Sequence, residues 1–370
     1  MENQIIMKTD NNKEDLFRFI NKKDGSQIDE NIKKCWYEAR AYVLHNLPEW
    51  ESKIKIGKDS PHHLCFIIHC FCIDDEPLMF SVVRQLALSA HYINFDEVNG
   101  RNATEIIILC NDMERVADIL KGEEYLSNLY EYSERSYIDI KIKLRKSYQN
   151  SDAIIIKADE VKEFIAGRES DDVYNIDTTK SQYVNMVYNV GMPIDNLPSS
   201  DMYTAERYNL AINVFCRQTH EQVKEKWNSL LKDINSTRFF QFQIRKIISN
   251  VFCSDCFESL IRGCGGNGNR TNPAEYIAQN LDIFTRREHS RWVVERLILG
   301  YTSPSSEDIY SLEETFGVER KNKIEKMKAE YKHIDLCSYW DLRRIDPDNI
   351  KYDSFLMLAA PYILGNQNLD

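Results

Sequence analysis

The 370-residue sequence has no long apolar run and no surplus of basic residues. No stretch approaches the length of about 18 apolar residues that indicates a membrane-spanning helix. The polar start, MENQIIMKTDNNKED, lacks the apolar segment and the cleavage site of a signal peptide. The formal net charge of −11 argues against binding along a nucleic acid backbone, although a local basic pocket for a small anion stays open. The ten cysteines are scattered through apolar runs, as in reduced cytosolic proteins. We therefore expect a cytoplasmic protein that binds no nucleic acid polymer and has no membrane span.

Common catalytic and metal-binding motifs are also missing. The sequence contains no G-x-S-x-G, no H-E-x-x-H and no Walker loop. Two cysteine-rich groups could suggest zinc, but neither has four ligands at paired spacing. These groups are Cys253, Cys256 and Cys264, and His62, His63, Cys65, His69, Cys70 and Cys72. We therefore predict no catalytic residue, no metal ligand and no resident cofactor, and a protein free of bound zinc.

Short apolar runs alternate with helical patterns between residues 57 and 176. The runs have the length and β-branched content of strands, at residues 62–72, 105–110, 137–144 and 152–159. A helical stretch opens at Pro77 after the first run, and Asp112 can cap a helix after the second. This alternation of strands and helices predicts a Rossmann-like α/β domain with a mainly parallel sheet. A helical extension over residues 1–56 precedes it.

The first strand-to-helix turn has no glycine. In a dinucleotide-binding domain, glycines at this turn let the backbone approach the pyrophosphate at the helix N-terminus. Here the turn contains Asp74, Asp75 and Glu76, whose carboxylates would repel a phosphate. We therefore expect a degenerate Rossmann-like domain that does not bind NAD tightly.

Beyond residue 177 the pattern turns helical. We expect a helical linker domain over residues 177–272, which ends in the turn-rich stretch GCGGNGNRTNP. This stretch lacks the Lys-Ser/Thr pair of a phosphate-binding loop, so the interpretation as a flexible loop is favoured. A C-terminal helical domain over residues 273–370 follows.

One helix of this last domain, EHSRWVVERLILGY (residues 288–301), has an unusual face. His289, Trp292 and Arg296 are spaced i, i+3 and i+7, beside an apolar face that includes Val294 and Leu297. In the simpler interpretation Trp292 packs in the core and Arg296 pairs with a carboxylate. In the other interpretation the three line a ligand pocket. An indole can stack on a base, a guanidinium can bind a phosphate through two hydrogen bonds, and a histidine can donate a hydrogen bond near neutral pH.

Two later stretches favour the pocket: KHIDLCSYWDL (residues 332–342) and KYD (residues 351–353). With the helix, they resemble the repeat domain of ryanodine receptors, in the stand-alone form found in many bacterial proteins. That family has a helix with His, Trp, Arg and a closing Gly-aromatic pair, then an H-P-D-L-like turn before a short helix, then an acid near a tyrosine. Bacterial members often join it to a domain like the NAD-binding domain of potassium-uptake regulators. Their helical linker has a signature that Trp227–Leu230 and Ser236–Arg238 match loosely.

The resemblance implies a fold and a function. The fold is a Rossmann-like α/β domain, a mostly α-helical region and a C-terminal α-helical domain like the ryanodine receptor repeat. The function is binding of a nucleotide-derived small molecule, as a sensor or effector in bacterial antiviral or stress signalling. The residues expected to bind this ligand are His289, Trp292, Arg296, Lys332, His333, Asp335, Tyr352 and Asp353.

Two other functions stay open at this point. The first is an enzyme acting on a nucleotide, with His289 or His333 as general acid–base and Asp353 orienting it. The second is a protein-assembly module with Trp292 and Trp340 as interface anchors. The sequence likewise leaves open a homo-oligomer or an effector protein as a partner.

Overall fold

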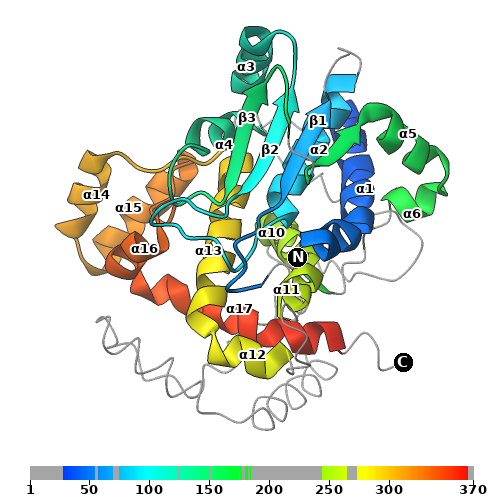
Figure 1. The fold of residues 1–370 in the computed structure, drawn as a ribbon. Coiled ribbons are helices and arrows are strands. Elements are labelled where there is room, and N and C mark those ends of the chain that lie inside the picture. The colour runs from blue at the N-terminus through cyan, green and yellow to red at the C-terminus, as the bar shows by residue number, and fades with distance from the viewer. Residues whose placement is uncertain are drawn as a thin grey trace, which may run out of the picture.

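The computed structural model shows an α/β region and a helical region (Figure 1). The described residues are 28–54, 57–69, 75–123, 125–149, 152–174, 176, 180, 181, 184, 244–264 and 273–365. The strands are β1 (Cys65–His69), β2 (Thr104–Leu109), β3 (Ile140–Arg145) and β4 (Ile154–Lys157). The helices before and among the strands are α1 (Glu30–Ile54), α2 (Glu76–Ser89), α3 (Met113–Gly122) and α4 (Ser127–Tyr132). The later helices are α5 (Ala158–Ala166), α6 (Ser170–Tyr174), α10 (Ile244–Asp255), α11 (Phe257–Gly263), α12 (Pro273–Gln279), α13 (Leu281–Ile298), α14 (Ser306–Glu313), α15 (Gly317–Ala329), α16 (Tyr339–Ile345) and α17 (Pro347–Gly365).

The four strands form one parallel sheet in the order β3-β2-β1-β4. Ile67 of β1 lies opposite Ile107 of β2 on one side and Ile155 of β4 on the other. The inner strands β1 and β2 are mostly buried apolar residues, as strands covered on both faces are. The edge strand β3 alternates between buried and partly exposed residues at its start. The predicted α/β region with a parallel sheet is therefore confirmed.

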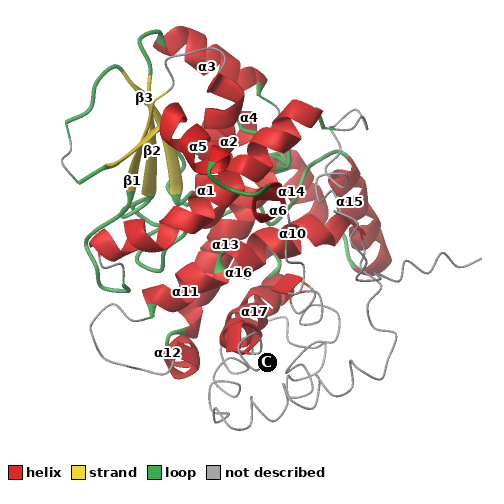
Figure 2. Ribbon diagram, turned by 90° about the vertical axis from the view of Figure 1, so that its right-hand side faces the viewer, coloured by secondary structure: helices red, strands yellow, loops and turns green. Residues whose placement is uncertain are grey.

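The helices beside the sheet begin where the sequence predicted. Helix α2 has a proline in its first turn, and all residues of Leu78–Ser89 are buried. Helix α1 packs along α2, and Figure 2 shows both on one side of the sheet. The side chain of Asp112 accepts a hydrogen bond from the backbone N–H of Arg115 at 3.0 Å, which confirms it as the cap of α3.

Helix α13 connects two apolar cores. Val294 and Leu297 belong to the core that also contains α1, α2 and the sheet. Leu281 and Phe284 belong to a second core, which includes residues of α11, α12 and α17. Figure 1 shows α13 in the middle of the molecule, between the sheet and α17. Because neighbours surround this helix, its polar side chains need partners inside the protein.

The predicted segment limits at residues 56, 176 and 272 stay predictions. Helices α10 and α11 are the described helices of the predicted linker. Several predicted features lie outside the described residues, namely Cys70, Cys72, Asp74, Trp227–Leu230, Ser236–Arg238 and most of the glycine-rich stretch. None of the helices in the described part of the chain combines the length and apolar character that crossing a bilayer requires.

Candidate ligand-binding site

Helix α13 has charged side chains on faces that the fold buries. Arg287, Glu288, His289, Arg291 and Glu295 are each 3% exposed or less. A buried charge without a partner costs several kcal/mol or more, so such a helix is stable only if its charges are paired. Charged residues point in nearly every direction around this stretch of helix, so no face of it could be buried without one.

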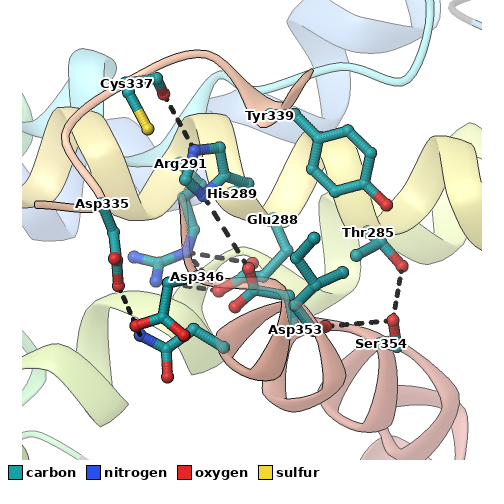
Figure 3. A network of polar contacts seen from close by, with 12 residues as sticks. Thr285, Glu288, His289, Arg291, Asp335, Cys337, Tyr339, Asp346, Asp353 and Ser354 are labelled. Atoms are coloured by element: carbon teal, nitrogen blue, oxygen red, sulfur yellow. Dashed lines mark hydrogen bonds and ion pairs between the residues drawn. The ribbon is translucent and has the colours of Figure 1, made fainter. Parts of the chain in front are cut away.

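Arg291 is the centre of a buried ion chain (Figure 3). Its Nε donates to both carboxylate oxygens of Glu288, at 2.9 and 3.0 Å, and its Nη1 donates to Glu295 at 2.7 Å. Burial opposes the charge of Arg291, but the two carboxylates outweigh it and raise the pKa of Arg291. The chain extends to Arg296, whose Nη2 lies 3.1 Å from Glu295, and to Arg287, whose Nη1 lies 3.7 Å from Glu288. Cations and carboxylates therefore alternate along the helix.

His289 has a polar neighbour near each ring nitrogen (Figure 3). Its Nε2 lies 3.0 Å from the carbonyl oxygen of Cys337. A carbonyl only accepts, so Nε2 holds the proton. The Nδ1 atom lies 3.9 Å from Oδ2 of Asp353, which is too long for a hydrogen bond. The imidazole is also nearly parallel to the ring of Trp292, with 6.3 Å between centroids.

Burial governs the charge of this pair. It lowers the pKa of His289 to about 4, so the imidazole is neutral at neutral pH. Burial, with the nearby charge of Glu288, raises the pKa of the Asp353 carboxyl well above its ordinary value. Both shifts follow from the cost of placing a charge in a dry interior. The contact between His289 and Asp353 is therefore not an attraction between opposite charges at neutral pH.

Trp292, Arg296 and His333 form a partly exposed layer next to the buried pair of His289 and Asp353. The Arg296 guanidinium lies 5.3 Å from the ring of Trp292 and 5.6 Å from the ring of Tyr301, within the range of cation–π contacts. The ring of His333 meets Trp292 edge-on at 4.8 Å. Burial lowers the pKa of His333 to about 3, and the charge of Arg296 adds to this effect. The Nη2 of Arg296 donates to Ser249, but its Nε has no hydrogen-bond partner among the described residues.

Asp335 lies in the turn that precedes α16 (Figure 3). The Nδ2 of Asn349 donates to Asp335 at 2.6 Å and to Asp346 at 3.1 Å. The backbone N–H of Asp335 donates to Nδ1 of His333 at 3.3 Å. Burial raises the pKa of Asp335 to about 7, and the charge of Asp346 adds to the shift. Asp335 therefore titrates close to neutral pH.

The structure joins most of the predicted binding residues in an unbroken series of contacts. The joined residues are His289, Trp292, Arg296, His333, Asp335 and Asp353. Lys332 is directed elsewhere, because its Nζ pairs with Asp308 at 3.2 Å and with Glu330 at 3.5 Å. Tyr352 is half-buried on α17, and one contact of its ring is with Nζ of Lys351 at 5.3 Å.

The sequence interpretation missed the residues that hold this layer in place. Glu288, Arg291 and Glu295 were not predicted, although their i, i+3 and i+7 spacing was visible as an acid–base–acid series on one helix. Tyr301 was not among the predicted binding residues, and its ring is a contact of Arg296. Cys337 contributes through its carbonyl, for which a sequence has no signal.

The three thiols of the group Cys253, Cys256 and Cys264 have hydrogen-bond acceptors inside the protein. The thiol of Cys256 donates to the carbonyl of Leu88, that of Cys264 to the carbonyl of Leu260, and that of Cys253 to Glu288. Burial raises the pKa of Cys256 to about 12, which keeps this thiol protonated. Among the described residues, no group of three or more His, Cys, Asp or Glu side chains is placed to hold a metal ion.

The acidic turn before α2 pairs with neighbouring helices. Asp75 forms an ion pair with Lys162 of α5, and Glu76 receives a hydrogen bond from Arg115 of α3 at 2.8 Å. Asp75 makes no side-chain cap of α2. The first turn of α2 thus presents carboxylates that are already paired with cations. The absence of tight NAD binding stays a prediction.

Comparison of the chain with models of protein families, with curated proteins and with solved structures found no significant match.

Proposed function

We propose that this protein binds a nucleotide-like small molecule at the layer formed by Trp292, Arg296 and His333, as a sensor or effector subunit. In this proposal the C-terminal region is a ligand-binding domain similar to the ryanodine receptor repeat. In this proposal the α/β region is of degenerate Rossmann type. Its strand order matches the first four strands of the doubly wound order 3-2-1-4-5-6. The biological setting implied by the resemblance is bacterial antiviral or stress signalling.

The observation that supports this proposal best is the position of Arg296. Its guanidinium lies over two aromatic rings, and its Nε has no hydrogen-bond partner among the described residues. The guanidinium already pairs with Glu295 and donates to Ser249, and its Nε is buried, so a ligand phosphate or carboxylate has to reach the guanidinium beside the indole. The neighbouring indole contacts His289 and His333 but is partly exposed, and the proposal places a base against the exposed part. Stacking of the base on an aromatic ring and hydrogen bonds from a guanidinium to the phosphate are the two contacts by which such a site would bind a nucleotide.

The buried residues beneath this layer support binding more than catalysis. A general acid–base must reach the substrate directly or through one water. His289 is 2% exposed, and the carbonyl of Cys337 already accepts its only proton. We therefore assign His289 and Asp353 a supporting role: they exclude water from this face of α13 and hold the Trp292 ring in place.

The experiment measures binding and turnover together. NAD, ADP-ribose and a cyclic dinucleotide are added separately to the full chain. Melting temperature and isothermal titration report binding, and chromatography reports products. The proposal expects at least one of these to bind without being consumed. Arg296→Gln should weaken binding at least about tenfold, as expected for the loss of a charge-assisted hydrogen bond.

Arg168→Gln is the matched control, because the Arg168 guanidinium also lies over an aromatic ring, 4.1 Å from that of Phe164 on α5. It should leave the affinity unchanged. Product formation would favour the enzyme instead. If none of the three binds, or if both variants lose affinity equally, the proposed site is wrong, and an assembly role becomes the better explanation.

A further inference from the structure

The turn between α14 and α15 presents apolar side chains to solvent. Tyr310 is 63% exposed, Phe316 81% and Val318 74%. In the described part of the chain seven large apolar side chains are exposed, and these three lie within nine consecutive positions. Single exposed apolar residues are common on soluble proteins, whereas a group of them indicates an interaction surface. The three residues are not part of the proposed ligand-binding layer.

The packing of α14 and α15 does not use these side chains. Leu312 of α14 and Met327 of α15 form a small buried core together with Ile334. Tyr310 is two positions from Leu312, and Val318 is nine positions from Met327. At 100° per residue, each of the two lies nearly opposite the buried residue of its own helix. They therefore point away from the core that holds the helices in place, and Figure 1 shows both helices at the edge of the molecule.

The charges of this surface are separated by helix. Helix α14 has three acidic residues and no cation, and Glu314 follows at its C-cap. Helix α15 has five cations and two acidic residues. The exposed residues Glu307 and Glu314 share the face of Tyr310, at i−3 and i+4. Exposed Lys321 shares the face of Val318, at i+3. An acidic side and a basic side therefore flank the apolar residues.

Two of these charges have no oppositely charged partner among the described residues. Glu314 lies at the C-terminal end of α14, where the helix dipole disfavours a carboxylate. It forms no ion pair within the described ranges, and neither does Lys321 on α15. The adjacent Glu313 is 3.8 Å from an exposed arginine, Arg344. A cation near Glu314 and an acid near Lys321 would stabilise both charges, and a second copy of the chain offers both.

We propose that this surface, Tyr310, Phe316 and Val318 with their flanking charges on α14 and α15, is a dimer interface between two copies of the chain. A two-fold axis at the apolar residues places the acidic α14 of one copy against the basic α15 of the other. Glu314 then lies near Lys321 of the partner subunit, and the same contact repeats across the axis. The net charge of −11 makes two copies repel over most of their surfaces, so they associate best where each has a basic side.

Sedimentation velocity of the full chain over a series of concentrations measures the monomer–dimer equilibrium. We expect a dimer. The double variant Phe316→Ser/Val318→Ser should raise its dissociation constant at least about tenfold, because it removes the apolar centre of the interface. Val98→Ser changes another apolar residue, which is 67% exposed, and should leave the equilibrium unchanged. Since all three positions are exposed, melting temperatures should stay close to that of the wild type.

A charge exchange tests the two-fold geometry. Glu314→Lys and Lys321→Glu should each weaken the dimer about tenfold, because each places like charges opposite one another at both repeats of the contact. An equimolar mixture of the two variants should dimerise again, since every lysine then faces a glutamate. The double variant Glu314→Lys/Lys321→Glu should also dimerise. A change that merely disturbed the helices would not be rescued in this way.

Three results overturn the inference. The first is a chain that stays monomeric throughout the concentration series. The second is a dimer that Phe316→Ser/Val318→Ser weakens no more than Val98→Ser does. The third is a mixture of the two charge variants that dimerises no better than either variant alone. A monomeric chain that binds phosphatidylserine vesicles, and loses this binding with Phe316→Ser, would assign the surface to a membrane and overturn the inference as well.

Discussion

Arg291 and Glu288 form a fully buried pair one helical turn apart, in which the Nε of Arg291 donates to both carboxylate oxygens of Glu288. The same guanidinium also holds Glu295. Two buried carboxylates therefore share this one central cation, besides the single further contacts of Arg296 with Glu295 and of Arg287 with Glu288. Since neither carboxylate can reach water, the stability of the helix that carries the candidate site rests on this arginine.

Arg291→Met should destabilise the protein strongly. It leaves Glu288 and Glu295 buried with too little positive charge, and breaking a buried pair from one side costs about 3–5 kcal/mol. Chemical denaturation measures the loss in free energy of unfolding. Lys121→Met, which breaks an exposed pair with Asp118, is the control and should change stability by less than about 1 kcal/mol. Similar small effects for both variants would contradict the structural role of Arg291.

Asp335→Asn should remove one source of pH dependence. The folded carboxyl keeps its proton up to about pH 7, whereas an ordinary aspartate releases it near 3.8. Between these values the folded state binds the extra proton, so Asp335 stabilises the fold at low pH and loses this contribution as the pH rises through about 7. The free energy of unfolding of the wild type minus that of Asp335→Asn should thus fall by about 2–4 kcal/mol from pH 4 to pH 8.

Denaturation curves at several pH values measure this difference. Asp346, Asn349, His333 and Lys328 are the groups that influence Asp335, and they are the same in both proteins. A flat difference for Asp335→Asn would show that this carboxyl is not protonated near neutral pH.

His289→Gln should have the opposite pH dependence. The folded imidazole has a pKa of about 4, against an ordinary value of 6.5. Between these values the unfolded state binds the extra proton, so acidification from pH 7 to pH 4 destabilises the wild type through this residue. Glutamine cannot titrate, and it still offers an N–H to the carbonyl of Cys337. The variant should therefore gain stability relative to the wild type as the pH falls. Denaturation curves at several pH values measure this gain, and a difference that does not change with pH would contradict a lowered pKa of His289.

Trp292→Ala should separate binding from folding. The indole is only partly buried, so its loss should cost less than the 3–5 kcal/mol of a core tryptophan, by about half. The loss of base stacking should weaken ligand binding by about 1–3 kcal/mol. Titrations under conditions where the variant is folded measure the affinity, and melting curves measure the stability. An unchanged affinity with a large fall in melting temperature would show that Trp292 only packs.

Local patterns were enough to predict the elements that position the site. Apolar β-branched runs gave four strands where expected, Pro77 falls in the first turn of α2, and Asp112 caps α3. These predictions succeed because strand period, helix capping and proline geometry depend on residues a few positions apart. The spacing of His289, Trp292 and Arg296 also placed their side chains near one another, as the ring contacts show.

The sequence alone determined the secondary structure of the α/β region and the candidate helix with its neighbouring aromatic and basic side chains. Only the tertiary structure decided that this helix is buried among two cores, that His289 is neutral, and that Asp335 titrates near neutral pH. It also decided the hydrogen-bond acceptors of Arg287, which lie at His91 and Cys256, 196 and 31 positions away. Burial and charge depend on distances between residues remote in the chain, and no local pattern contains those distances.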